Sequence, residues 1–455
     1  MTGQLEAGRA AVKRGDLDEA RLLLGPLVAE SPAGPASIVL ARLELDAERP
    51  EVAVPILDGF LAVRSDHGLA SLMRARAHLA TGDLAGARDD ATRAGELLED
   101  RSSAERVLAK VEAAEDARRV AALVERAAPL IGVIDAGHVE ARSTGPSQEM
   151  RDAARELAGL PLEGDWTTDP NLSKIAFFVH AADPEEALRS YDAHLVEVSA
   201  EFGYITWPRR IQEHVRGRRV IDVGCGFGGF GVGFLVAGAS SYVGLDPAMN
   251  MDSSAARNKR LRQRADMGIT PRQIADDLPA IHLVRGKSED LAFDEQFDTI
   301  SLHNVTEHLA EPDLVFAGLV PLCHADTAVV FHHHNYYCWN GHHDPPVQPA
   351  QLDLSSPAHT AVYDWRHIDL LPDLPPGHRY LTGLNRIRLD ELRAITERYF
   401  DIERWDEIPS SAATLDRFTP EILDRVRRTI PDLTERDLVV HAVLAVARPK
   451  RPREA

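Results

Sequence analysis

The stretch RRVIDVGCGFGGFGVGFLVAGASSYVGLDP, residues 218–247, decides the fold of this chain. It reads as a strand, a glycine-rich loop, a helix and a second strand. An apolar, β-branched run begins at Val220, as a buried parallel strand requires, and the glycines after it let a ligand approach the backbone closely. The second strand stops at Asp246, where a carboxylate is placed to accept the hydroxyls of a ribose. The stretch therefore predicts a nucleoside-binding unit.

The glycine spacing alone leaves the cofactor open. Gly224, Gly226 and Gly229 also fit the G-x-G-x-x-G pattern of dinucleotide-binding enzymes, so an NAD oxidoreductase is one alternative. Asp222 argues against it, because an NAD-binding strand is usually apolar at that place. A cofactor with a free amino group and a sulfonium favours a carboxylate there.

Four motifs follow one another within residues 218–335: DVGCGFG, GLDP, GKSEDLAF and FDTISLHNVTEHL. With these motifs in this order, the chain resembles a class I S-adenosylmethionine-dependent methyltransferase. The resemblance implies an α/β fold with a Rossmann-like, mostly parallel sheet, an antiparallel last strand, and S-adenosyl-L-methionine as cofactor. It also implies that the cofactor is bound by Asp222, Gly224, Cys225, Gly226, Gly228, Asp246, Ser288, Glu289, His303 and Asn304.

Histidines gather after two of the predicted strands. His308 follows the strand over residues 297–302, and five histidines stand in HHHNYYCWNGHHD, residues 332–344, after the strand over 327–331. Because the carboxyl ends of parallel strands meet at one edge, these side chains are expected where a methyl acceptor lies. They would supply a base and orienting groups for a hydroxyl or amine, bind a divalent metal that positions an oxygen-rich acceptor, or form a polar network that packs the loop.

We expect acceptor handling to be the first of these roles and metal binding the last, because no metal-ligand spacing here is diagnostic. The predicted site therefore includes no metal ligand. The predicted catalytic residues are His308, His332 and His334. The predicted acceptor-binding residues are Tyr337, Trp339, His342, His343 and Arg386.

The N-terminal part repeats. GDLDEA at residues 15–20 recurs as GDLAGA at 82–87, and a weaker copy places Ala53 between Ala20 and Ala87 at spacings of 33 and 34 residues. This period resembles that of tetratricopeptide repeats, so three helix pairs are expected, with a face for a protein partner or for self-association. The predicted divisions are a repeat domain over 1–130, a linker and short helix over 131–163, and a methyltransferase domain over 164–455 with an acceptor-side insertion at about 345–435.

The composition of the chain argues against some classes of substrate and binding partner. A net charge of −20 over 455 residues disfavours a nucleic-acid substrate. No apolar run approaches the length of a membrane span, and three scattered cysteines suggest no disulfide framework. A cytoplasmic protein is expected.

The leading hypothesis is an enzyme that transfers a methyl group from S-adenosylmethionine to an oxygen or nitrogen of a small-molecule or glycan-like acceptor. One alternative is metal-assisted O-methylation that uses the histidine cluster. Another is a repeat-based scaffold or binding protein whose methyltransferase domain senses the cofactor.

Overall fold

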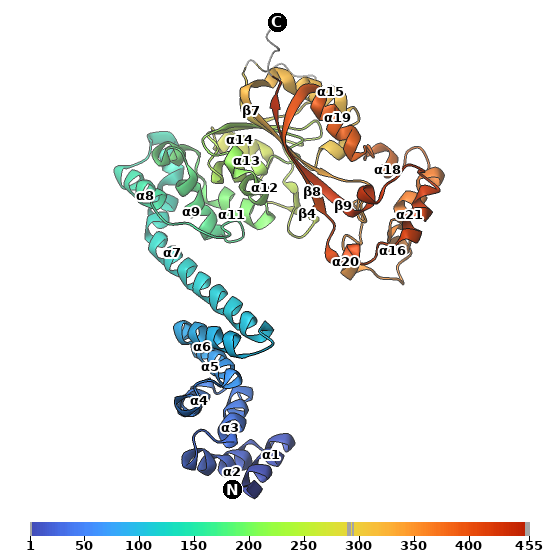
Figure 1. Ribbon diagram of the computed structural model, residues 1–455. Coiled ribbons are helices and arrows are strands. Elements are labelled where there is room, and N and C mark those ends of the chain that lie inside the picture. The colour runs from blue at the N-terminus through green and yellow to red at the C-terminus, as the bar shows by residue number, and fades with distance from the viewer. Residues whose placement is uncertain (1, 289–292, 294, 451–455) are drawn as a thin grey trace. The chain divides into compact units, whose positions relative to one another are not determined.

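A computed structural model describes residues 2–288, 293 and 295–450 of the chain (Figure 1). It divides into two compact units, Met1–Glu125 and Arg126–Ala455. None of the helices in the described part is long and apolar enough to cross a membrane. The division into three domains expected from the sequence stays a prediction.

The N-terminal unit contains the expected helix pairs. Ala20, Ala53 and Ala87 are fully buried where neighbouring helices touch. Alanine suits these positions because a larger side chain would hold the helices apart. Asp16 and Asp83 cap the second helix of the first and third pairs by accepting backbone N–H bonds. The helices are α1 (Thr2–Arg14), α2 (Leu17–Glu30), α3 (Pro35–Asp46), α4 (Pro50–Val63), α5 (Gly68–Thr81) and α6 (Leu84–Leu97). The prediction of three pairs is confirmed.

The long helix α7 (Ser102–Thr144) extends into the segment that was expected to be a linker from residue 131 onward. Residues 132–144 are helical, although two glycines weaken the helical pattern there. Ile134 and Ala141 are buried at helical spacing, and Gly137 brings α7 against Met150 of α8 (Gln148–Ala158), since a Cβ at Gly137 would lie 2.8 Å from the sulfur. Tertiary packing therefore overrides the weak local signal.

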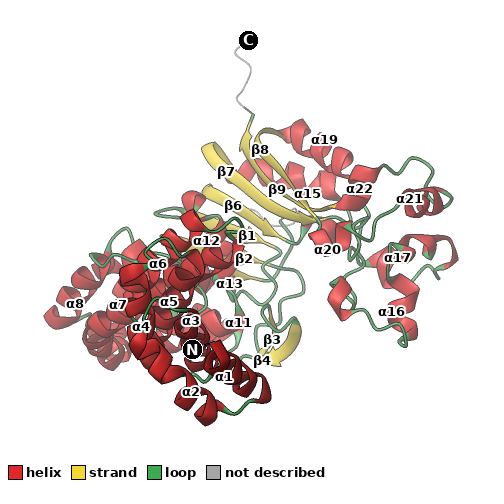
Figure 2. Cartoon of the chain, turned by 60° about the horizontal axis from the view of Figure 1, so that its bottom comes forward, coloured by secondary structure: helices red, strands yellow, loops and turns green. Residues whose placement is uncertain are grey.

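The C-terminal unit is built on a seven-stranded sheet with the order β5-β2-β1-β6-β7-β9-β8 (Figure 2). The first five strands are parallel, and β9 runs antiparallel to both β7 and β8. A mostly parallel sheet with an antiparallel last strand is thereby confirmed. The strands are β1 (Arg219–Val223), β2 (Ser241–Leu245), β5 (Ile281–Val284), β6 (Phe297–His303), β7 (Cys323–His334), β8 (Phe400–Pro409) and β9 (Val440–Pro449).

Helices cover this sheet and bury its apolar runs. Phe316 of α15 (Pro312–Leu319) and Leu392 of α19 (Leu389–Tyr399) belong to the core cluster that includes Ile221, Ile300 and Phe331 of the central strands. Every residue of α13, which follows the glycine loop, is buried. Helices before and around the central strands are α9 (Pro170–His180), α10 (Pro184–Ala187), α11 (Ala193–Phe202), α12 (Thr206–Arg210), α13 (Phe230–Val236), α14 (Pro271–Asp277), α15 (Pro312–Leu319) and α19 (Leu389–Tyr399).

A short hairpin, for which the sequence offered no prediction, lies between β2 and β5. It consists of β3 (Ala255–Asn258) and β4 (Gln263–Asp266), which pair antiparallel and form a separate sheet (Figure 2). Its charged residues lie beside the cavity described below.

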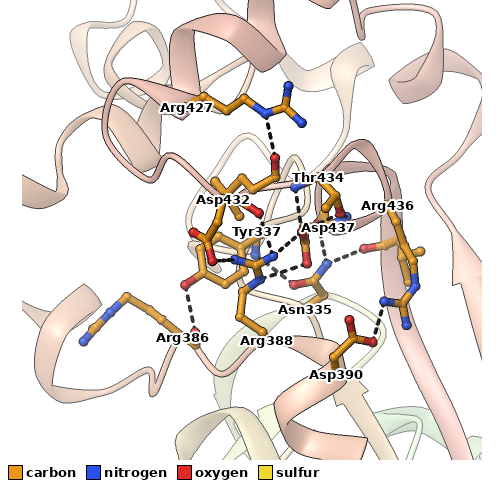
Figure 3. A network of polar contacts seen from close by, with 12 residues as sticks. Asn335, Tyr337, Arg386, Arg388, Asp390, Arg427, Asp432, Thr434, Arg436 and Asp437 are labelled. Carbon is orange, nitrogen blue, oxygen red and sulfur yellow. Dashed lines mark hydrogen bonds and ion pairs between the residues drawn. The ribbon is translucent and has the colours of Figure 1, made fainter.

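The segment between β7 and β9 forms a small second core around Trp339, Trp365 and Leu438. Its helices are α16 (Pro357–Val362), α17 (Arg366–Asp369), α18 (Arg379–Thr382), α20 (Ala412–Leu415), α21 (Pro420–Arg427) and α22 (Glu435–Val439). A polar network ties this core to the sheet (Figure 3). Asp437 is buried and accepts two hydrogen bonds from Arg388, and the side chain of Asn335 donates to the carbonyls of Asp437 and Val440.

Gly341 tests how tightly the loop after β7 is closed. A Cβ there would overlap the carbonyl group of Tyr336 and lie 2.6 Å from the carbonyl oxygen of Asn335, so backbone must move. We expect Gly341→Ala to lower the free energy of unfolding by about 2–3 kcal/mol. Gly377→Ala, with no atom within 4 Å of its Cβ, is the control. Equal urea midpoints for the two variants would contradict the close approach.

Candidate active site

A cavity of about 480 Å³ opens at the carboxyl ends of β1, β2 and β6. Glycine-loop residues form one wall, and the β3–β4 hairpin contributes Arg257 and Lys259 to another. His303 and Asn304, at the end of β6, complete it. Ligands of open α/β sheets bind at this edge.

The glycine loop needs its glycines for two different reasons. Gly224 has φ +77°, and a Cβ there would lie 2.5 Å from the side chain of Val305, so the loop passes close to the chain after β6. Gly226 also has a positive φ, +63°, but its Cβ position faces open space. The loop therefore leaves room for a ligand directly against the backbone of Gly226.

Asp246 closes the loop from the end of β2. Its carboxylate accepts the backbone N–H of Gly226 at 2.9 Å and that of Ala248 at 2.7 Å, and it lines the cavity. A carboxylate can accept further hydrogen bonds with its remaining lone pairs, so Asp246 is fixed in place and still able to bind hydroxyl groups.

Asp222 lies at the floor of the cavity, one residue before the end of β1, and is almost fully buried. The hydroxyls of Ser301 and Tyr242 donate to its two oxygens at 2.8 and 3.0 Å. Burial raises the pKa of Asp222 to about 7, which these hydrogen bonds and the charge of Lys259 only partly offset. A cationic ligand above it would favour the ionised form.

Lys259 is a site residue that the sequence analysis missed. Its ammonium lies 5.1 Å from the ring centre of Phe230 and 6.0 Å from that of Tyr204, and burial lowers its pKa. Among the described residues, neither Lys259 nor Arg257 takes part in an ion pair. The available signal was a run of basic residues, RNKRLRQR at 257–264, inside a chain of net charge −20. Such cations are available to an anionic group.

The end of β6 presents a stacked histidine. The ring of His303 lies parallel to Trp207 with centroids 4.5 Å apart, and its Nδ1 is buried without a hydrogen-bond partner. Burial lowers the pKa of His303 far below the ordinary value, so the ring is neutral. Asn304, with φ +55°, connects this wall to β7, because its Oδ1 lies 2.6 Å from Nδ1 of His332.

The other predicted catalytic histidines form a second group beyond His332. Nδ1 of His334 lies 2.5 Å from Nε2 of His343, and the His343 ring contacts His308 edge-on at 5.3 Å. His308 also hydrogen-bonds the carbonyl of Gly383 at 2.7 Å. The structure also brings Cys338 and His441 to this group, which the sequence did not suggest because His441 is about a hundred residues distant on β9.

The remaining predicted acceptor residues are mostly packed inside the second core. Tyr337 donates its hydroxyl to the carbonyl of Arg386 at 2.9 Å, and the Trp339 indole donates to Asp364 at 3.1 Å. The guanidinium of Arg386 donates to the carbonyls of Tyr380 and Leu384, and His342 is 1% exposed. These contacts stabilise the loop. An acceptor role for Tyr337, Trp339, His342 and Arg386 stays a prediction.

The four other residues predicted to bind the cofactor lie at different distances from the cavity or outside the described residues. Cys225 lines the cavity beside Gly224 and Gly226. Gly228 lies deeper in the loop with φ +84°, where a Cβ would lie 2.8 Å from the Leu283 side chain. Ser288 is buried on the chain after β5, and Glu289 lies outside the described residues. Adenine binding by these last two stays a prediction.

The cavity fits S-adenosylmethionine by the chemistry of its walls. Asp246 could accept ribose hydroxyls, Asp222 could offset the ammonium and sulfonium charges, and Lys259 could bind the carboxylate; these roles stay predictions. The open space against Gly226 leaves room for the ligand to lie close to the protein backbone. When bound, the cofactor supplies a methyl group on a positively charged sulfur.

Acid should destabilise the C-terminal unit, because burial holds its histidines neutral. The folded-state pKa values of His332, His333 and His343 are each about 3, and those of His342 and His367 about 2 and 4. Below pH 6.5 the unfolded chain binds more protons at these groups, so stability present above pH 6.5 is lost as the pH falls.

Each of these histidines should cost about 1.4 kcal/mol per pH unit below 6.5. Asp222 and Glu307, whose pKa values burial raises to about 7 and 8, act in the opposite sense, as does Asp369, whose pKa burial also raises, but they are three groups against five. Urea unfolding at pH 7.5 and at pH 4.5 measures the net effect of these groups, and we expect a lower urea midpoint at pH 4.5. An unchanged or higher midpoint at pH 4.5 would contradict neutral buried histidines.

Comparisons with known proteins found similarities to both parts of the chain. Residues 221–329 match a family model described as a methyltransferase domain. No curated protein matches the chain. The solved YcgJ protein of Bacillus subtilis is 14% identical, with 55% of this chain and 99% of that chain covered and a TM-score of 0.31. An S-adenosylmethionine dependent methyltransferase of Mesorhizobium loti is 19% identical, with 53% and 96% covered and a TM-score of 0.30. The first TPR domain of human RPAP3 is 23% identical, with 26% and 92% covered and a TM-score of 0.24.

The family match begins in β1 and ends within β7, so it spans the glycine loop, Asp246 and His303 at the end of β6. These are the elements whose geometry forms the cavity. The chain therefore carries a methyltransferase domain whose cofactor is S-adenosylmethionine.

Proposed function

We propose that the enzyme methylates an oxygen or nitrogen atom of a small-molecule or glycan-like acceptor. The observation that carries this proposal is the neutral histidine wall, His303 and His332, which follows the cofactor cavity on adjacent strands β6 and β7. Their ring centres lie 5.9 Å apart. An oxygen or nitrogen nucleophile needs alignment and a hydrogen-bond acceptor for its proton, and a neutral imidazole supplies one.

His332 is the residue best suited to orient the acceptor. Its Nδ1 donates to Oδ1 of Asn304 at 2.6 Å, since an amide oxygen only accepts, and this leaves a lone pair on Nε2. Burial lowers the pKa of His332 to about 3, so the ring stays neutral throughout the physiological range. A base this weak aligns the acceptor's O–H or N–H group and takes the proton only as the new bond to carbon forms.

Apolar walls around the histidines keep water from competing with the acceptor. Trp207 and Phe230 both contact the ring of His303, and both are almost fully buried. Direct attack on the methyl group in such a dry space displaces S-adenosylhomocysteine. The chain's own contribution is therefore alignment and exclusion of water, which together supply much of the acceleration of such transfers.

The cations of the hairpin favour an acceptor that bears an anionic group. Arg257 and Arg264 line the cavity together with Lys259, and one of the three suffices for the carboxylate of the cofactor. The net charge of −20 disfavours nucleic acid as the acceptor.

We assign the N-terminal repeats a separate role, in binding a protein partner or in self-association. Their side chains include exposed apolar residues, among them Leu22 at 75% and Val63 at 68% exposure. Exposed leucine and valine on stacked helices favour contact with another chain. A cytoplasmic location stays a prediction.

The activity is tested with the full chain, methyl-labelled S-adenosylmethionine, and separate pools of hydroxylated metabolites, amines and oligosaccharides. We expect label in a metabolite or oligosaccharide and release of S-adenosylhomocysteine. Transfer only to protein or nucleic acid from a cell extract would contradict the proposed acceptor class.

Asp246→Asn tests the ribose contact. Removing the charge from this carboxylate should weaken binding of S-adenosylhomocysteine at least about tenfold, a loss of roughly 1.4 kcal/mol. Asp252→Asn is the matched control, because Asp252 lies on the same segment but pairs with Arg272 outside the cavity. Calorimetric titration measures both. Equal affinities in the two variants would contradict the assignment of Asp246.

His332→Gln tests the orienting role. Glutamine can still bond Asn304 but offers no lone pair at the Nε2 position, so we expect kcat to fall about 100-fold with little change in cofactor affinity. His282→Gln, an exposed histidine on β5, is the control and should keep full activity. A His332→Gln enzyme with undiminished kcat would overturn the role.

A further inference from the structure

Three side chains of metal-ligand type meet where β7 ends beside β9. They are His334, the last residue of β7, Cys338 in the turn that follows, and His441 on β9. Sγ of Cys338 lies 3.5 Å from Nε2 of His334 and 3.7 Å from Nδ1 of His441. The three ligand atoms all lie within 4.8 Å of one another.

These separations suit one tetrahedral ion. With zinc–sulfur and zinc–nitrogen bonds of about 2.3 and 2.05 Å, two ligands at the tetrahedral angle stand about 3.6 Å apart. A thiolate with two imidazoles also selects zinc over magnesium or calcium, which prefer oxygen. We propose that His334, Cys338 and His441 bind one zinc ion.

The neighbouring histidine supports this assignment. Nδ1 of His334 lies 2.5 Å from Nε2 of His343, the separation of a hydrogen bond. When Nδ1 carries the proton, the lone pair of Nε2 is directed at the proposed ion, as second-layer partners of zinc histidines commonly arrange. A different grouping, Glu307 with His334 and His343, is less suited, because two nitrogen ligands of one ion stay about 3 Å apart or more.

The scaffold beneath the three ligands is rigid. The backbone N–H of Asn335 donates to the carbonyl of His441 at 3.0 Å, and its side chain donates to the carbonyls of Asp437 and Val440, both at 2.7 Å. Figure 3 shows Asn335 and Asp437 within the network that Arg388 completes. Asn335, the residue after His334, is thus bonded to His441 itself and to two residues that precede it in the chain. Ligands fixed in this way need little reorganisation on binding.

The place of the site suggests its use. Three protein ligands leave a fourth position, as in zinc sites that bind a reacting molecule. His334 stands two residues after His332, a distance of about 7 Å along the strand, so the fourth position lies on the acceptor side of the cofactor cavity. An oxygen of the acceptor would occupy it, and this part of the inference rests on the proposed function.

Cobalt replaces zinc and reports thiolate ligation by its absorption. Metal-free full-length protein titrated with Co²⁺ should bind one equivalent tightly and show a sulfur-to-cobalt charge-transfer band that added Zn²⁺ abolishes. Cys338→Ser should lose that band, whereas Cys323→Ser, which removes a buried cysteine bonded to Leu319, should keep it. His441→Gln should weaken metal binding at least tenfold.

The wild-type titration decides the proposal even where a variant fails to fold. No charge-transfer band in the wild-type protein, or a band that survives Cys338→Ser, overturns the zinc site. Binding of S-adenosylhomocysteine to the metal-free protein is measured alongside, because loss of that binding speaks against the methyltransferase site and not against the metal. Suppose that the titration shows metal binding and that the metal-free protein still binds S-adenosylhomocysteine. Undiminished methyl transfer by the metal-free protein would then overturn the proposed contact between metal and acceptor, but not the metal site itself.

Discussion

The parallel pairing of β1 with β2 and β6 is the constraint on which the site depends. The register places Asp222 opposite Gly244 on one side and Ser301 on the other, so the strands end together. The residues that follow each strand then face one space. A shift of one residue in this register would turn Asp222 to the opposite face of the sheet and remove its bond with Ser301. The next pairing, His303 with His332, extends the same edge to the acceptor side.

Burial of titratable side chains away from water sets their protonation states at this edge of the sheet. The chain as a whole is strongly acidic, yet the cavity gathers Arg257, Arg264 and Lys259. Burial holds the histidines neutral and raises the pKa of Asp222 toward neutrality. Neutral imidazoles can accept hydrogen bonds or bind a metal, and neither role is open to a protonated ring. The same desolvation thus serves both the proposed methyl transfer and the proposed zinc site.

Much of the fold could be predicted because strong local patterns agreed with the final structure. The glycine loop, the strand ending at Asp246 and the alanine spacing of the repeats each depend on neighbours in sequence. Residues 132–144, expected to belong to a linker, are helical, because burial of Ile134 and the approach of Met150 stabilise a helix that its glycines disfavour. Such long-range packing leaves no local pattern.

The site was harder to predict for the same reason. Asp222, Asp246, His303 and Asn304 could be placed at the cavity because they sit at fixed positions of the βα units. Lys259 reaches it from a hairpin with no recognisable motif. His441 joins His334 and Cys338 only through the antiparallel pairing of β9 with β7, which a spacing rule along the chain cannot express.

The central claim is that the edge formed by β1, β2 and β6 binds S-adenosylmethionine. Isothermal titration of the full chain with S-adenosylhomocysteine, and with NAD for comparison, tests it most directly. We expect one S-adenosylhomocysteine to bind per chain and no heat from NAD. Folded protein that binds NAD, or that binds neither compound, would contradict it.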